Sequence, residues 1–210
     1  MEKKWIIFDV MGVIFTVGDD TNELLVPYVQ KIDESCTRER INEAYIEASL
    51  GRITSCEFWN LLGCASDNNY KEIERTYLDE CLTLDEQFIE SAQRLKEDYN
   101  LAILSNDVSE WGTYLREKYG INDVVEFSVI SSDVGYRKPS KDIYKIALGK
   151  ANVAPEDCIF IDDRDKNLIP AQNLGMKVVR FLRDDTACGL EDVVTVSSFI
   201  ELEKNISEMW

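Results

Sequence analysis

Four short apolar segments of this 210-residue chain are followed by polar side chains that could act in catalysis. In chain order these side chains are Asp9, Ser105 and Asn106, Lys138, and the pair Asp162 and Asp163. Any one of them alone is explained as a turn former, a helix N-cap or a solvated surface group. Three carboxylates brought together would raise one another's pKa values unless a cation neutralised them, and oxygen ligands without histidine favour Mg²⁺. The set therefore predicts a magnesium site built from Asp9, Asp162 and Asp163.

The hydroxyl of Ser105 and the ammonium of Lys138 suit the remaining oxygens of a transferring phosphoryl group. A carboxylate nucleophile beside a hard cation suits phosphoryl transfer through an aspartyl-phosphate. The chain contains no histidine, which excludes Ser-His-Asp and Cys-His catalysis and histidine-ligated zinc. It also lacks the GxxxxGKS/T and GxGxxG phosphate-binding patterns. Carboxylates, lysine, hydroxyls and a hard cation must therefore supply any chemistry.

The composition limits the partners of the protein. A net charge of −17, from 23 basic and 40 acidic residues, argues against nucleic acid or an anionic membrane. Lys3 and Lys4 precede an apolar stretch as in a signal peptide, but Asp9 interrupts it, and no run approaches the length of a membrane span. Six cysteines lie far apart without a CxxC pair, which indicates reduced thiols in a cytoplasmic protein.

The elements that must position these residues are short strands alternating with amphipathic helices. Apolar runs predict strands at 5–9, 101–105, 127–131, 158–162 and 177–181. Helical patterns begin at the capping residues Ser109 and Ser140 and end near Gly120 and Gly149. Such alternation predicts an α/β fold with a doubly wound, Rossmann-like parallel sheet. Ligands of such sheets bind beyond the carboxyl ends of the strands, where the polar residues are placed.

Residues 17–86 break this alternation. Four helical patterns follow one another there with no strand-like run between them: "TNELLVPYVQKI", "RERINEAYIEAS", "CEFWNLLG" and "YKEIERTYLDECL". We expect an all-helical cap at 17–86, joined by two linkers to a core domain of residues 1–16 and 87–210. The cap would close over the site and select the substrate. Its basic residues are candidates for substrate contacts, although solvation on a helix surface is the favoured interpretation of each: Lys31, Arg38, Arg40, Arg52, Lys71 and Arg75.

Four motifs in order, "FDVMGVIF", "LSN", "GYRKP" and "FIDDRDKN", resemble those of the haloacid dehalogenase (HAD) superfamily. The forms "YRKP" and "IDD" are similar to the branch that includes α-D-glucose-1-phosphatase, and the helical insert resembles the family's cap. The resemblance implies that Asp9 is the nucleophile and that Ser105 and Lys138 hold the transferring phosphoryl group. It places Asn106 beside them as a substrate-binding residue.

The resemblance also implies how the metal is held. Mg²⁺ would bind the carboxylates of Asp9 and Asp163, with Asp162 nearby as a helper. The main-chain carbonyl two residues past the nucleophile is a further ligand in the family. Here that carbonyl belongs to Met11, and a change of side chain does not remove it.

The side chain of Met11 departs from the family pattern, because most phosphatases of the family carry a second Asp there as general acid and base. General acid–base catalysis raises reaction rates by about 10²–10⁴-fold. A phosphomutase of this family depends on that acid and base, so the absence of the Asp argues against a phosphomutase. Without an acid the rate should depend steeply on the pKa of the leaving group. Aryl, acyl or anomeric phosphates should then be hydrolysed faster than alkyl esters. Met11→Asp should then raise activity on poor leaving groups by up to about 10²-fold. Asp19 and Asp20 are the nearest substitutes by sequence, although a surface turn is the favoured interpretation of both.

These observations predict a Mg²⁺-dependent hydrolase, most simply a phosphatase acting on a small phosphorylated metabolite such as a sugar phosphate. One alternative is a catalytically weak or inactive relative that binds a phosphorylated ligand. A weaker alternative is a 2-haloacid dehalogenase, which needs no metal and has little use for Asp162 and Asp163. The substrate and the oligomeric state are open.

Overall fold

A parallel sheet forms the centre of the structure, a computed structural model that describes residues 3–65, 69–183, 190 and 193–210. Its six strands lie in the order β3-β2-β1-β4-β5-β6. Their bounds are β1 Trp5–Phe8, β2 Asn100–Ser105, β3 Phe127–Ile130, β4 Cys158–Asp162, β5 Lys177–Phe181 and β6 Val194–Val196. All neighbours pair in parallel, and the central strand β1 pairs with both β2 and β4. The predicted α/β fold with a doubly wound parallel sheet is confirmed.

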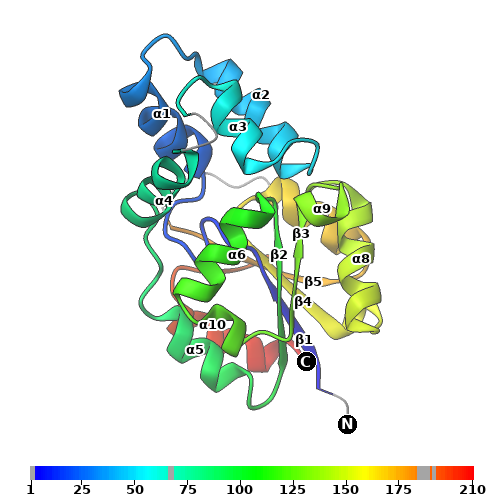
Figure 1. Cartoon of the computed structure of the whole chain (residues 1–210). Helices are drawn as coiled ribbons and strands as arrows, with labels where there is room; N and C mark the ends of the chain where they lie inside the picture. Colours follow the sequence, from blue (N-terminus) through cyan, green and yellow to red (C-terminus); the bar gives the residue numbers. More distant parts are fainter. Residues whose placement is uncertain (1–2, 66–68, 184–189, 191–192) are drawn as a thin grey trace.

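Helices cover both faces of the sheet (Figure 1). One face carries α5 Phe88–Leu95, α6 Ser109–Lys118 and α10 Phe199–Ile206, and the other carries α8 Lys141–Ala151 and α9 Asp165–Asn173. Side chains of β1 alternate between these layers: Ile6 and Phe8 pack with the first group, and Ile7 packs with the second. Because both faces are covered, the central strands are continuous apolar runs.

The segment between β1 and α5 lies over the carboxyl ends of the strands (Figure 1). Its described residues form η1 Thr21–Leu25, α1 Val26–Ile32, α2 Arg38–Ser49, α3 Ser55–Leu61 and α4 Tyr70–Glu80. The two connections to the sheet are paired, since the N–H of Thr16 donates to the carbonyl of Thr83 (3.0 Å) and that of Asp85 donates to the carbonyl of Ile14 (2.9 Å). The helices predicted for 17–86 are thus observed, while the division into separate cap and core domains stays a prediction.

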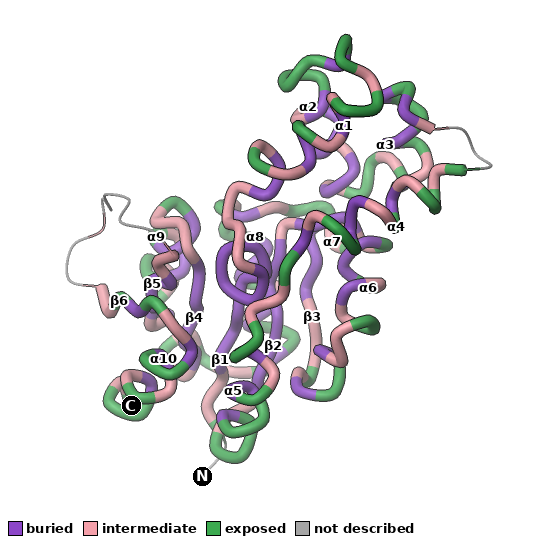
Figure 2. The backbone as a smooth tube through the Cα atoms, turned by 90° about the vertical axis from the view of Figure 1, so that its left-hand side faces the viewer, coloured by how far each residue is buried: buried purple, intermediate pink, exposed green. Residues whose placement is uncertain are grey.

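An aromatic cluster joins this cap segment to α6. Trp59 and Tyr77 of the cap are fully buried, and their ring centroids lie 5.9 and 5.6 Å from that of Trp111. Glu74 accepts hydrogen bonds from the indole N–H groups of Trp59 (3.1 Å) and Trp111 (2.6 Å). Figure 2 shows buried chain both along the strands and on the cap helices. Aromatic pairs contribute about 0.5–1.5 kcal/mol each beyond their buried area, so this cluster holds the cap against the core.

Several elements differ from the sequence prediction. The edge strand β6 was not predicted, and α8 continues to Ala151 instead of ending near Gly149. The chain reverses after α8 at Asn152, which adopts a left-handed conformation with φ 54°. Short helical turns complete the core: η2 Ile121–Asp123, α7 Ser131–Val134, η3 Pro155–Asp157 and η4 Ser207–Met209.

Two further observations concern the surroundings of the protein. In the described part of the chain, no helix has both the length and the apolar character needed to span a membrane. Cys36, Cys64, Cys81 and Cys158 within it carry free thiols. Cys188 lies outside the described residues.

Asp107, two residues after β2, predicts a pH-dependent stability. It is 3% exposed, and burial raises its pKa from 3.8 to about 7. The folded protein therefore holds a proton that the unfolded chain releases, and this group lowers the stability as the pH rises between those values. Asp107→Asn removes the titration and keeps an acceptor for the Val108 N–H, now 2.7 Å from the carboxylate. We expect the variant to be more stable by up to about 4 kcal/mol near pH 8, and equally stable near pH 4.

Urea unfolding of both proteins near these two pH values measures the difference. The other titrating groups are common to both proteins, so their contributions cancel except for the interaction of Asp107 with Asp20. A stability difference that does not change with pH would show that Asp107 does not titrate as proposed.

Candidate active site

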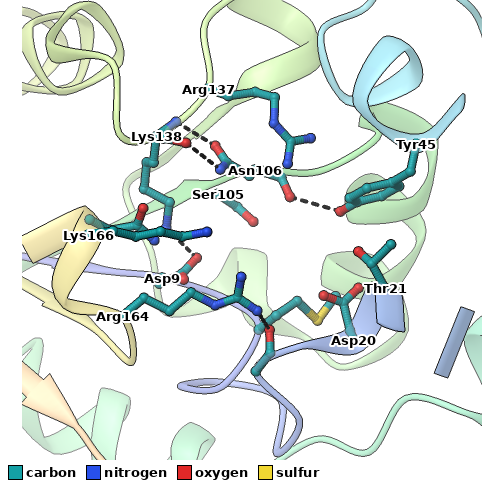
Figure 3. Close-up of a pocket in the computed structure, with 13 residues that line it drawn as sticks. Asp9, Asp20, Thr21, Tyr45, Ser105, Asn106, Arg137, Lys138, Arg164 and Lys166 are labelled. Carbon is teal, nitrogen blue, oxygen red and sulfur yellow. Dashed lines mark hydrogen bonds and ion pairs between the residues drawn. The ribbon is translucent and has the colours of Figure 1, made fainter. Parts of the chain in front are cut away.

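Three adjacent strands end at one edge of the sheet and place predicted residues there. Asp9 directly follows β1, Ser105 ends β2 and Asp162 ends β4, and these strands are neighbours in the order β2-β1-β4. One cavity of about 100 Å³ is lined by the predicted residues Asp9, Met11, Ser105, Asn106 and Lys138 (Figure 3). The rest of its lining is Gly18, Asp20, Thr21, Tyr45, Arg137, Arg164, Lys166 and Asn167. The topology of the sheet thus gathers most of the predicted residues into one site.

Lys138 connects two of the carboxylates. Its Nζ lies 2.6 Å from Asp9 Oδ1 and 2.7 Å from Asp162 Oδ2, and its side chain is buried. Burial lowers the pKa of Lys138, but the carboxylates of Asp162 and Asp9 outweigh this and raise the pKa above its ordinary value. The ammonium group therefore stays charged and holds Asp9 at the cavity.

Asn106 holds the main chain of Lys138. Its side-chain oxygen accepts from the N–H of Lys138 at 2.7 Å, and its side-chain nitrogen donates to the carbonyl of the same residue at 3.0 Å. The hydroxyl of Tyr45, from the cap, donates to the main-chain carbonyl of Asn106 at 3.0 Å. Ser105 is buried and lines the cavity beside them. The substrate-binding roles of these residues stay predictions, and the contacts show in addition that Asn106 positions Lys138.

The carboxylates form an acidic corner beside the cavity. Oxygens of Asp9, Asp162 and Asp163 lie within 4.8 Å of one another. Oδ1 of Asp163 is buried and, among the residues that the structure describes, has no hydrogen-bond partner. Burial and then the neighbouring Asp162 raise the pKa of Asp163 to about 7. A hard cation would neutralise this charge and satisfy the unpaired oxygen, so the donor set fits Mg²⁺.

Asp162 differs from its two neighbours because protein groups already surround its carboxylate. Oδ1 accepts from the main-chain N–H of Arg164 at 2.9 Å, and the amide nitrogen of Asn167 lies 3.0 Å from both oxygens. With Lys138, these donors fix the orientation of the group. Its role as a metal ligand stays a prediction, and the observed contacts make it a support for Lys138.

Two glycines let the loop after β1 close around Asp163. At Gly12, whose φ is +82°, a Cβ atom would lie 2.5 Å from the Asp163 carboxyl group, and at Gly18 it would lie 2.1 Å from Oδ2. Arg183 donates to the carbonyl oxygens of Gly12 and Val13 and so fixes the loop. The Met11 carbonyl precedes Gly12 in this loop, and its role as a metal ligand stays a prediction.

Three cations in the cavity lining were not predicted from the sequence. Arg137, Arg164 and Lys166 add positive charge to a protein whose net charge is −17, so an anion would be attracted locally. Nη1 of Arg137 is buried and lacks a hydrogen-bond partner within the described chain. The guanidinium lies over the ring of Tyr45, 5.3 Å from its centroid. All three lie within the quoted motifs "GYRKP" and "FIDDRDKN", and this was the only signal in the sequence that could have indicated them.

The expectation that Asp20 lies in a surface turn is wrong. This residue is 8% exposed and lines the cavity, because the chain turns directly from it into η1 beneath the other cap helices. Asp19 is half-buried and lies outside the cavity lining. The lining also includes none of the six basic cap residues considered above, all of which are among the described residues, in agreement with their solvated interpretation.

Sequence comparison identifies the class of protein. Residues 6–181 match the profile of the haloacid dehalogenase-like hydrolases, and the chain belongs to this family. It is similar to D-ribitol-5-phosphate phosphatase of Bacteroides thetaiotaomicron, with 23% identity over 184 residues that cover 83% of this chain and 89% of that protein. It is also similar to glyceraldehyde 3-phosphate phosphatase of Pyrococcus furiosus, with 37% identity over 89 residues that cover 41% and 36% of the two chains.

Solved structures share the fold. A HAD family enzyme from Bacteroides thetaiotaomicron, crystallised with magnesium and inorganic phosphate, matches with a TM-score of 0.74 and 21% identity over 88% of this chain and 97% of that one. A 2-haloacid dehalogenase from Pseudomonas syringae matches with a TM-score of 0.74 and 13% identity over 100% of both chains. The same fold therefore occurs in relatives of different chemistry, and the site must indicate the reaction.

Proposed function

We propose that this hydrolase is a Mg²⁺-dependent phosphatase that acts on a small phosphorylated metabolite through an aspartyl-phosphate on Asp9. The main support is the buried, unpaired Oδ1 of Asp163 beside Asp9 and Asp162, because such a cluster has a use when a hard cation binds there. A dehalogenase, which needs no metal, would not need this cluster. The phosphatases among its relatives support the same class of substrate.

Each residue of the site has its own role in the proposed reaction. Asp9 attacks the phosphorus atom with one carboxylate oxygen while the bond to the leaving oxygen breaks. Ser105 and Lys138 donate hydrogen bonds to the phosphoryl oxygens, and Asp162 keeps Lys138 in place from the other side at 2.7 Å. Water then attacks the phosphorus of the aspartyl-phosphate, which releases inorganic phosphate and restores Asp9. Asp9, Asp163 and the Met11 carbonyl, with Asp162 nearby, would hold Mg²⁺, which supplies positive charge to the site when bound.

We also propose that the protein acts in the cytoplasm on a soluble substrate. The free thiols observed among the described cysteines are consistent with a reducing compartment. The strongly negative net charge does not favour nucleic acid as a partner. Residues of the cap segment that reach the cavity, such as Thr21 and Tyr45, would contact the part of the substrate that differs between metabolites.

Release of inorganic phosphate from p-nitrophenyl phosphate tests this function. We expect turnover to require added Mg²⁺, to stop in excess chelator and to return when Mg²⁺ is restored. A relative that only binds a phosphorylated ligand would release no phosphate under any of these conditions. Release that continues unchanged in chelator would contradict the assignment of the acidic corner to a metal. A screen of sugar phosphates and nucleotides would then identify the substrate.

A further inference from the structure

The cavity contains one more carboxylate, which comes from the cap segment. Asp20 immediately precedes η1 and lines the cavity together with Asp9, Met11 and Ser105. Figure 3 shows it on the cap side of the cavity, beside Thr21 and across from Asp9. In-line attack by Asp9 on a phosphate ester would put the leaving oxygen on the side of the phosphorus atom opposite Asp9, and Asp20 lies across the cavity from Asp9.

A purely structural role does not explain this carboxylate. Within the described residues, no lysine or arginine forms an ion pair with Asp20. The nearby Arg164 pairs with Asp19 at 3.5 Å and with Asp163 at 3.7 Å instead. Asp107 is buried in the same way, but Asp20 differs from it because it lines the cavity, where its carboxyl group can reach a bound substrate.

We propose that Asp20 is the general acid and base of the phosphatase reaction, in place of the carboxylate that Met11 lacks. This inference rests on the proposed function. In the first step Asp20 gives its proton to the leaving oxygen, which also takes the electron pair of the breaking bond to phosphorus, while Asp9 forms the new bond. In the second step the Asp20 carboxylate takes a proton from the attacking water, the water oxygen bonds to phosphorus, and the bond to Asp9 breaks. Asp20 ends protonated and inorganic phosphate leaves.

The surroundings of Asp20 suit both steps. Burial is the largest effect on the pKa of Asp20 and raises it from 3.8 to about 7. The positive charge of Arg164 and, less strongly, the N–H of Thr21 and the charge of Arg137 oppose this rise, while the neighbouring Asp19 adds to it. A carboxyl group with a pKa close to the working pH can give and take a proton with comparable ease.

An acid in the cavity changes the expectation drawn from Met11. With Asp20 donating a proton, the rate of the native enzyme should depend only weakly on the leaving group. Met11→Asp alone should then raise the activity little, because Asp20 already donates the proton to the leaving group. The steep dependence expected from the sequence should instead be a property of the enzyme without Asp20.

A series of aryl and alkyl phosphates with different leaving-group pKa values tests this inference in the Mg²⁺-containing enzyme. Asp20→Asn keeps the size of the side chain and removes the acid. We expect kcat/KM to fall by about 10²–10⁴-fold for alkyl phosphates and little for p-nitrophenyl phosphate. The slope of log(kcat/KM) against leaving-group pKa should therefore become steeper than that of the wild type. Loss of the base should also make the aspartyl-phosphate accumulate during turnover.

Two further variants sharpen the result. Asp19→Asn makes the same change one residue away, outside the cavity lining, and should keep the slope of the wild type. Adding Met11→Asp to Asp20→Asn supplies an acid at the family position and should restore the shallow slope. Equal slopes in active wild-type and Asp20→Asn enzymes would overturn the inference while leaving the phosphatase function intact. A wild-type protein without Mg²⁺-dependent turnover would overturn the proposed function and this inference with it.

Discussion

An Asp9→Asn enzyme should form no aspartyl-phosphate and should release phosphate at least about 10³-fold more slowly than the wild type. An amide cannot attack phosphorus, and the change also removes one of the three carboxylates of the acidic corner. The fold should persist, because the amide oxygen can still accept from Lys138 Nζ and from the Val10 N–H, both now 2.6 Å from Oδ1. Steady-state phosphate release and the unfolding temperature together measure these two effects.

The covalent intermediate provides the direct test. Mass spectrometry of acid-quenched wild-type enzyme with substrate should show the addition of one phosphoryl group, which the Asp9→Asn variant should lack. An Asp9→Glu variant keeps the charge but moves the carboxylate by one methylene group, so it should retain Mg²⁺ binding better than it retains turnover. Turnover that is unchanged in Asp9→Asn would exclude an aspartyl-phosphate mechanism.

Lys138→Met should have the second large effect, on stability as well as on activity. The change leaves Asp9 and Asp162 buried side by side without the ammonium group that lies 2.6 and 2.7 Å from them. Removing one partner of a buried ion pair costs about 3–5 kcal/mol, and the loss should shrink at low pH, where the carboxylates can bind protons. Activity should fall by about 10²–10³-fold, because in the proposed reaction Lys138 donates a hydrogen bond to the phosphoryl oxygens. Urea unfolding in excess chelator measures the stability without any compensation by metal.

Lys150→Met is a matched control for this variant. Both lysines lie over an aromatic ring, Lys138 over Phe160 at 5.3 Å and Lys150 over Phe127 at 5.0 Å, measured to the ring centroids. Lys150 is exposed, so its change should cost no more than about 1 kcal/mol and leave turnover intact. Equal losses of stability in the two variants would show that the buried ion pairs of Lys138 contribute nothing specific.

The buried strands could be predicted because their sequences carry a clear signal. Strands β4 and β5 have the same bounds in the structure as in the prediction, 158–162 and 177–181. Strand β4 is a continuous apolar run up to Asp162, as expected for a strand covered on both faces, and β5 contains the β-branched pair Val178 and Val179. Strand β6 has three residues at the edge of the sheet, too few for any periodic pattern. The residue expected as an N-cap, Ser109, is the first residue of α6, and Val108 takes the cap position. Shifts of this size depend on tertiary contacts.

The site was predictable where it depends on the ends of the strands and on the motifs that follow them, such as the one that contains Lys138. Asp9, Ser105 and Asp162 follow from the rule that parallel strands end at one edge of a sheet. Asp20 and Tyr45 reach the same cavity because the cap segment folds back over that edge, and no local pattern separates a buried Asp from one in a surface turn. Their contribution is a long-range property of the fold.

The cap segment leaves and rejoins the core between two hydrogen-bonded segments, 14–16 and 83–85. The cap segment between them is therefore equivalent to one long loop inserted into the core. The hydrogen bonds between 14–16 and 83–85 keep the two ends of this loop close together. The entropy of closing a loop grows slowly with its length, so insertions or deletions there add little entropic cost to the folding of the core. Replacement of a whole helix must also replace the contacts that Trp59 and Tyr77 make with Trp111. We therefore expect that the cap segment can be exchanged where its contacts with Trp111 are kept. In such an exchange the proposed nucleophile Asp9 would stay with the core, whereas the proposed acid Asp20 and its proton would be inherited with the cap.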